Sequence, residues 1–161
     1  MLFITDIFGE IHAKEDRDRI EKLILSNNRR VEYDFILTEE IGHHIALTER
    51  DKQIGIRNHL WGISPRSYEL GIELNIPVIG IDTWEDYIYR KPLAEQFVLR
   101  ETRMVEVIRE YSLKGSCAVI VGDTHLRTIQ TKELGDVSLL HKAFYKRDGY
   151  NIIRSPNGEI K

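Results

Sequence analysis

The chain has 161 residues, 42% hydrophobic and 30% charged, a composition typical of one globular domain that excludes disordered, collagen-like and coiled-coil chains. Its 23 basic and 26 acidic side chains give a formal charge of −3, so we expect neither nucleic acid nor a membrane surface as a partner. The single cysteine, Cys117, excludes a disulfide framework, and no apolar stretch approaches the roughly 20 residues that span a bilayer. The apolar start, residues 1–8, lacks the basic beginning of a signal peptide, so we expect a cytoplasmic protein.

Short apolar runs alternate with helix-like segments along the chain. This alternation predicts an α/β fold, a mainly parallel sheet flanked by helices. The predicted strands cover residues 2–8, 33–38, 76–81 and 117–121. The predicted helices cover residues 13–27, 66–74 and 93–111, with a further helix that begins at residue 84 and is interrupted at Lys91-Pro92. Residues 39–62 form a long irregular stretch to which the pattern assigns no element.

The tail of the chain, residues 137–153, alternates loosely between apolar and polar residues. Within it, Asp148-Gly149 separates Phe144-Tyr145 from Ile152-Ile153, which is a hairpin signal. We therefore expect antiparallel edge strands at the C-terminus. Nothing in the pattern indicates a linker, so residues 1–161 are predicted to form a single domain.

The same short motif follows two of the predicted strands. Gly9-Glu10-Ile11-His12 follows the first strand, and Gly122-Asp123-Thr124-His125 follows the fourth. A glycine at a strand exit permits a tight turn, and parallel strands bring both histidines to the same edge of the sheet. The second strand leads into Glu39-Glu40, and strand alternation turns only one of these two side chains toward that edge. We favour Glu39.

Two imidazoles and a carboxylate are a common ligand set for a divalent metal with positions open to water. The sequence therefore predicts a possible Mn, Co, Zn or Fe(II) site formed by His12, Glu39 and His125. Without a metal, the same groups can supply a general base and the residue that orients it. Arg100, on the predicted helix 93–111, can bind a substrate anion or stabilise a developing oxyanion.

These motifs resemble those of one superfamily. Gly9 to His12, the run Leu37 to Glu40, the helix segment Arg100 to Met104, and Val121 to Leu126 are similar to motifs of Tiki and TraB proteins, ChaN haem-binding lipoproteins and erythromycin esterases. The resemblance implies that His12 and His125 are paired active-site histidines, that Glu10 and Glu39 are their acidic partners, and that Arg100 is the helix arginine. It implies a hydrolase of peptide, ester or lactone bonds, with a peptide or small molecule as substrate.

Two other functions stay open at this stage. A ChaN-like resemblance fits a non-catalytic module that binds haem, a metabolite or a protein. The series Asp6, Glu10, His12, Asp123, His125 also suggests a metallophosphoesterase, although the motifs of that class are incomplete. The oligomeric state and the role of His43-His44 cannot be derived from the pattern.

Several polar residues receive structural interpretations. Asp6 lies within an apolar strand and needs a partner, either the turn at Gly9 or a histidine. Arg103 is interpreted as a surface charge and Met104 as a core residue. His141 is expected on an edge strand, and Cys117 is expected to be a buried, unreactive thiol.

Overall fold

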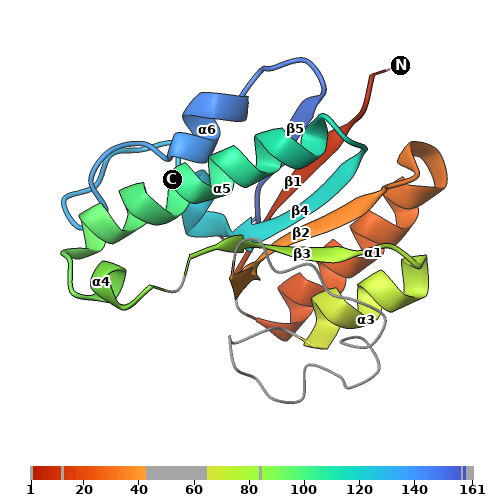
Figure 1. Ribbon diagram of the computed structural model, residues 1–161, viewed down its shortest axis with the longest axis horizontal. Coiled ribbons are helices and arrows are strands. Elements are labelled where there is room, and N and C mark those ends of the chain that lie inside the picture. The colour runs from red at the N-terminus through yellow and green to blue at the C-terminus, as the bar shows by residue number, and fades with distance from the viewer. Residues whose placement is uncertain (1, 12, 43–64, 84, 157, 159–161) are drawn as a thin grey trace.

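Five parallel strands form one sheet in the order β3-β2-β4-β1-β5 (Figure 1). The computed structural model describes residues 2–11, 13–42, 65–83, 85–156 and 158. The strands are β1 (Thr5–Glu10), β2 (Phe35–Gly42), β3 (Val78–Asp82), β4 (Cys117–Gly122) and β5 (Tyr150–Ile153). The predicted α/β class with a mainly parallel sheet is therefore confirmed.

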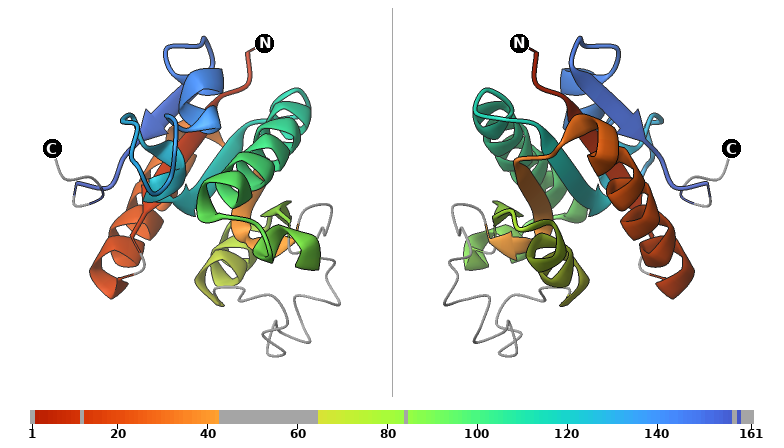
Figure 2. Two further views of the ribbon diagram at one scale, coloured as in Figure 1. Left: turned by 90° about the vertical axis from the view of Figure 1, so that its left-hand side faces the viewer. Right: turned by 90° about the vertical axis from the view of Figure 1, so that its right-hand side faces the viewer.

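Helices cover both faces of the sheet. Figures 1 and 2 show α1 and α3 on one face and α5 and α6 on the other. The helical elements are α1 (Lys14–Val31), α3 (Pro65–Leu74), α4 (Asp86–Tyr89), α5 (Leu93–Ser112), the 3-10 turn η2 (Asp123–Leu126) and α6 (Leu139–Phe144). Among the described helices, none is long and apolar enough to cross a membrane.

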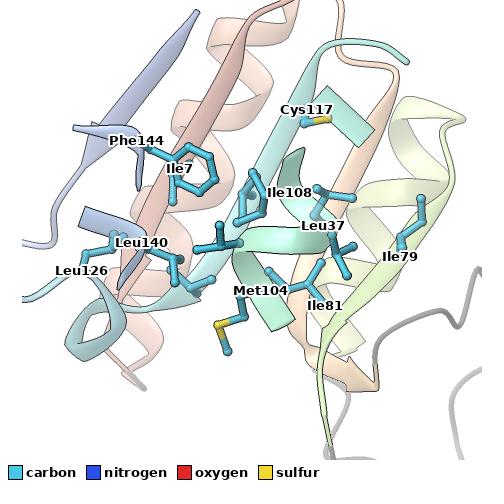
Figure 3. Packing of buried hydrophobic residues seen from close by; sticks show 14 residues of the cluster. Ile7, Leu37, Ile79, Ile81, Met104, Ile108, Cys117, Leu126, Leu140 and Phe144 are labelled. Atoms are coloured by element: carbon cyan, nitrogen blue, oxygen red, sulfur yellow. The ribbon is translucent and has the colours of Figure 1, made fainter. Parts of the chain in front are cut away.

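Two apolar clusters hold the helices against the sheet. Successive strand residues point to opposite faces, so Ile7 packs under α5 and α6 and Phe8 packs under α1. Figure 3 shows the first cluster, where Met104 and Ile108 of α5 lie over the strands. Burial of each such side chain contributes roughly 1.5–3 kcal/mol. Cys117 belongs to this cluster, and its burial raises the thiol pKa to about 12, so it is no nucleophile.

The first helix is longer than the sequence predicted. It continues through Asn27 and Asn28 and ends where Glu32 adopts a left-handed backbone conformation, with φ of 55°. Asn28 takes part in this ending rather than breaking the helix, because its carbonyl accepts the Glu32 N–H and its side chain accepts the Tyr33 N–H at 2.9 Å.

The predicted antiparallel C-terminal strands are wrong. Part of that segment is the helix α6, capped by Ser138, whose hydroxyl accepts the N–H groups of two residues in the first turn. Leu140 and Phe144 stand four residues apart and are both buried, so the loose alternation is a helical stripe. Gly149, with φ of 85°, turns the chain into β5, which pairs in parallel with β1.

The connections diverge on either side of β4. The helices that follow β1 and β2 in the described chain, α1 and α3, lie on one face of the sheet, whereas β4 is followed by η2 and by α6 on the other face. In open parallel sheets, ligands bind where neighbouring connections diverge at the carboxyl ends of the strands. The candidate site lies at this edge.

Candidate active site

Glu39 and His125 meet across the β2/β4 boundary. The Nε2 atom of His125 lies 3.1 Å from Oε2 of Glu39, and His125 is only 3% exposed. Gly122 also holds the Glu39 side chain, because its backbone N–H donates to Oε1. A Cβ atom at position 122 would lie 2.8 Å from that same oxygen, so a glycine is needed for this close approach.

Arg100 of α5 ties Glu39 to the end of β3. Its guanidinium donates to both carboxylate oxygens of Asp82, at 2.6 to 3.2 Å, and to Oε2 of Glu39 at 3.3 Å. Asp82 is fully buried. Burial disfavours the charged guanidinium, but the bonds to Asp82 outweigh this effect and raise the pKa of Arg100. Arg100 is therefore a permanent cation beside the Glu39–His125 pair.

The other ring nitrogen of His125 also faces a carboxylate. Nδ1 lies 3.0 Å from Oε2 of Glu101, a fully buried residue of α5. The same oxygen accepts a hydrogen bond of 2.6 Å from Arg127, and the second oxygen accepts the Leu139 N–H at 3.0 Å. Phe97 stacks on the His125 ring with centroids 4.7 Å apart, and both Arg100 and Arg127 lie over the Phe97 ring.

The network fixes the charges of its members. Burial alone would lower the pKa of His125, but the carboxylates of Glu39 and Glu101 raise it to about 9. Burial alone would raise the pKa of Glu39, but His125 and Arg100 lower it to about 2. Burial opposes ionisation of Glu101 as well, yet the bonds from His125 and Arg127 lower its pKa. At neutral pH, His125 is thus an imidazolium between two carboxylates.

The first copy of the motif is arranged differently from the second. Glu10 pairs with Gly122 in the strand register, at the same sheet edge, but its side chain forms an ion pair of 3.3 Å with Arg17 on the α1 face. Together with Ser67 of α3 they line a small cavity of about 20 Å³. Strand alternation explains the separation, because Glu10 and Glu39 point to opposite faces of the sheet. His12 lies outside the described residues.

Asp123 of the second motif has a structural role. Its carboxylate accepts two hydrogen bonds from Arg154, at 2.7 and 3.0 Å, and the Ser155 N–H at 2.8 Å. The Ser155 hydroxyl in turn donates to Asp16, which also accepts the Ile11 N–H at 2.7 Å. Residues 154 and 155 therefore connect the turn after β4 with the segment after β1.

The structural interpretations of other residues have mixed outcomes. Within the described part of the chain, the partners of Asp6 are the hydroxyl of Tyr33 and the Asn151 side chain at 2.8 Å, and not the turn at Gly9 or a histidine. Arg103 pairs with Glu106 on the surface, and Met104 is fully buried, as predicted. His141 lies on α6, where it stacks on Tyr145. His43 and His44 lie outside the described residues.

Three residues of the network were not predicted: Asp82, Glu101 and Arg127. Glu101 carried a detectable signal, because it stands four residues after Phe97 and three before Met104, on the apolar stripe of α5. A carboxylate on a buried stripe must have partners. Asp82 and Arg127 carried no comparable signal, since Asp82 is the last residue of β3 and Arg127 follows η2, and polar residues are ordinary at the ends of elements.

The predicted metal set is only partly described. Glu39 and His125 come together, but both ring nitrogens of His125 face carboxylates and Arg100 occupies a position beside Glu39. Among the described residues, no group of three His, Cys, Asp or Glu side chains could hold a metal ion. These residues, in this arrangement, do not fit a metal, and the set that includes His12 stays a prediction.

Comparison with known proteins relates the fold to bacterial toxins and effectors. No family model matches the chain, and no curated protein matches its sequence. RRSP, a MARTX toxin effector domain from Vibrio vulnificus, aligns over 88% of this chain with a TM-score of 0.63 and 14% identity. A structure of bacterial protein toxins aligns over the same share, with a TM-score of 0.60 and 13% identity. This chain spans about a third, 32%, of each of those two chains.

The type III effector HopBA1 is similar over nearly its whole length. The alignment covers 94% of this chain and 88% of HopBA1, with a TM-score of 0.50 and 13% identity. At identities this low, the similarity to these structures establishes the fold and nothing finer.

These comparisons correct the predicted family. Membership in the Tiki/TraB, ChaN-like and erythromycin esterase superfamily is wrong, because no family model matches and the structures that share the fold are toxin effector domains and a type III effector. The peptide, ester or lactone hydrolase of that type, the haem-, metabolite- or protein-binding module and the metallophosphoesterase are withdrawn on the same ground. Gly9 lies within β1 and Gly122 ends β4, and each glycine leaves room for a neighbouring carboxylate, Asp123 and Glu39 respectively. Close approach of this kind is a general use of glycine and is not restricted to one family.

Proposed function

We propose that this chain is the catalytic domain of a toxin-type or effector-type protein, and that its chemistry is proton transfer by the Glu39–His125 pair. The observation that carries the proposal is the buried ion pair itself, with Arg100 beside it at the carboxyl edge of the sheet. The toxin effector domains and the type III effector that share the fold support the biological part of the proposal.

The charges of the pair define the first step. His125 is an imidazolium at neutral pH, so its Nε2 proton is available to a substrate atom that acquires negative charge. Once the proton has left, neutral Nε2 is an acceptor and can take a proton from an attacking group. Glu39 remains a carboxylate and stabilises the imidazolium when it forms again.

Exposure indicates the side from which a substrate approaches. The side chains of Arg100 and Glu39 are 17% and 11% exposed, whereas that of His125 is 4% exposed. A substrate therefore meets the guanidinium and the carboxylate before it reaches the imidazole. Arg100 is placed to stabilise negative charge that develops on the reacting group.

Growth of cultured eukaryotic cells tests the proposal without knowledge of the substrate. We expect induced expression of the wild-type chain to slow growth, and the variants His125→Gln and Glu39→Gln to abolish the effect at equal protein levels. Arg103→Gln is the matched control, because Arg103 lies on α5 but pairs only with Glu106 among the contacts described for it.

Circular dichroism and cooperative thermal unfolding establish that each variant is folded. A wild-type chain without effect on growth contradicts the toxin-type function. A folded His125→Gln variant that inhibits growth as strongly as the wild type contradicts the role of the pair.

A further inference from the structure

Glu101 is the most deeply buried carboxylate that contacts the pair, and the proton-transfer step leaves it without a role. We infer that Glu101 and Arg127 are positioning residues that fix the rotation of the His125 ring so that Nε2 faces Glu39. This inference rests on the proposed function, since it assigns the ring a working orientation.

Two different contacts define the placement of the His125 ring. Phe97 stacks on it with an interplanar angle of 28°, which fixes the plane of the ring. Stacking does not distinguish the two ring orientations that are related by a half-turn about the Cβ–Cγ bond, because the flipped ring lies in the same plane on Phe97 with its nitrogens and carbons exchanged. The hydrogen bond from Nδ1 to Glu101 distinguishes the two orientations, because a flipped ring would present carbon to this carboxylate.

The hydrogen bonds of Glu101 show why a carboxylate is needed. Its two oxygens accept three N–H donors, from His125, Arg127 and the Leu139 backbone. An amide of the same shape has one oxygen and an NH₂ group. In a glutamine at this position, the NH₂ group would therefore point at N–H donors and could not accept their hydrogen bonds. Glu101→Gln therefore removes acceptor capacity with little change in volume.

Arg127 holds Glu101 in place from the far side. It is 4% exposed, and its guanidinium also donates to the carbonyl of Asp136 at 3.0 Å and to that of Thr124 at 3.2 Å. The ring of Phe97 lies 5.3 Å from its guanidinium carbon. These contacts hold Arg127 in position, and Arg127 in turn holds Oε2 of Glu101, the oxygen that contacts Nδ1 of His125.

Nuclear magnetic resonance of the ring N–H groups tests the inference directly. In the ¹⁵N-labelled full chain at neutral pH, we expect two hydrogen-bonded ring N–H signals from His125, assigned by their loss in His125→Gln. In Glu101→Gln, we expect the Nδ1 proton to exchange with water about tenfold faster or more, as loss of a charge-assisted hydrogen bond predicts. Arg127→Gln should accelerate the same exchange, and Arg127→Lys should restore it in part.

Glu106→Gln is the matched control, because Glu106 lies on the exposed side of α5 and pairs with Arg103. Where Glu101→Gln does not fold, Arg127→Gln and Arg127→Lys decide the question, since Glu101 keeps its charge in both. Exchange within twofold of the wild-type rate in the folded variants overturns the inference.

The growth assay separates this inference from the proposed function. Loss of growth inhibition in Glu101→Gln, together with faster Nδ1 exchange, supports a positioning role. If His125→Gln still inhibits growth, the proposed function fails, while the ring signals continue to report whether Glu101 and Arg127 orient the ring. Unchanged inhibition in Glu101→Gln, with His125→Gln inactive, overturns the inference alone.

Discussion

The backbone of Gly122 lies in close contact with the carboxylate of Glu39. The N–H of Gly122 donates to Glu39, and a Cβ atom there would approach the same oxygen to 2.8 Å. We predict that Gly122→Ala displaces Glu39, abolishes growth inhibition and lowers the free energy of unfolding by about 1–3 kcal/mol, as overpacking does. Urea unfolding and the growth assay measure the two effects.

Gly149→Ala provides the comparison for this variant. Gly149 has a φ of 85°, so an alanine there strains the backbone far along the chain from the site. It should lower stability as well but leave growth inhibition intact. Equal loss of inhibition in both variants would show that the effect of Gly122→Ala comes from stability alone.

The ion pair of His125 predicts a dependence of stability on pH. The pKa of His125 rises from 6.5 to about 9 in the folded chain, so its contribution is complete below pH 6.5 and is lost as the pH rises toward 9. By the same linkage, the contribution of Glu39 is complete above pH 4.5 and is lost as the pH falls toward 2. We expect the free energy of unfolding to fall by about 3 kcal/mol between pH 6 and pH 9.

Urea unfolding of the wild type and of His125→Gln at pH 6 and pH 9 measures this difference. The variant should lose most of the pH dependence, because the raised pKa of His125 is its source. A slope that is identical in the two proteins would rule out His125 as its source.

At the scale of single residues, the sequence predicted three of the six charged side chains, His125 included, that the structure brings together at the site. It identified Glu39, Arg100 and His125, because strand ends and a helix face place them at one edge. It could not identify Asp82 and Arg127, because their partners lie far away in sequence and no local pattern encodes such contacts. The charged residues next to Glu101 made it look like a surface residue, although its position on the apolar stripe of α5 indicates burial.

Helix α6 connects the capping of a short element to the site. Ser138 accepts the N–H groups of Leu140 and His141 and donates its hydroxyl proton to the carbonyl of His125. We predict that Ser138→Ala lowers the free energy of unfolding by about 1–2 kcal/mol, the usual cost of a lost N-cap, measured by urea unfolding. Ser138→Thr, which keeps the hydroxyl, should recover part of the loss, and a neutral Ser138→Ala variant would contradict this assignment.

The elements themselves were predictable to different degrees. Buried parallel strands are continuous apolar runs, so the four strands β1 to β4 were all identified, with ends shifted by a few residues. The segment before β5 was misassigned, because a short helix with two buried residues and a strand alternation look alike over so few positions. Tertiary packing on α5, not local pattern, decides that α6 is helical.

At the scale of the whole molecule, residues 154 and 155 join the two segments that leave β1 and β4. Arg154 holds Asp123, and Ser155 contacts both Asp123 and Asp16. We predict that Arg154→Gln lowers the free energy of unfolding by about 1.5–3 kcal/mol, since a buried carboxylate loses charge-assisted bonds. Amide hydrogen exchange at Ser155 and Ile11 should accelerate together, because one network holds both N–H groups.

Arg147→Gln is the control for this prediction, since Arg147 is exposed in the neighbouring turn. It should leave both exchange rates unchanged. Acceleration at Ser155 without any change at Ile11 would show that the two segments are not coupled.

The strand order also determines when the Glu39–His125 pair can form during synthesis. β4 lies between β1 and β2, so neither earlier strand has its central neighbour until β4 has left the ribosome. Glu39 is synthesised early, but its partners, the Gly122 backbone N–H and His125, are synthesised only later. A truncated chain that stops before β4 lacks both partners and therefore cannot form the pair. The strand order thus delays the assembly of the candidate site until most of the chain has been completed.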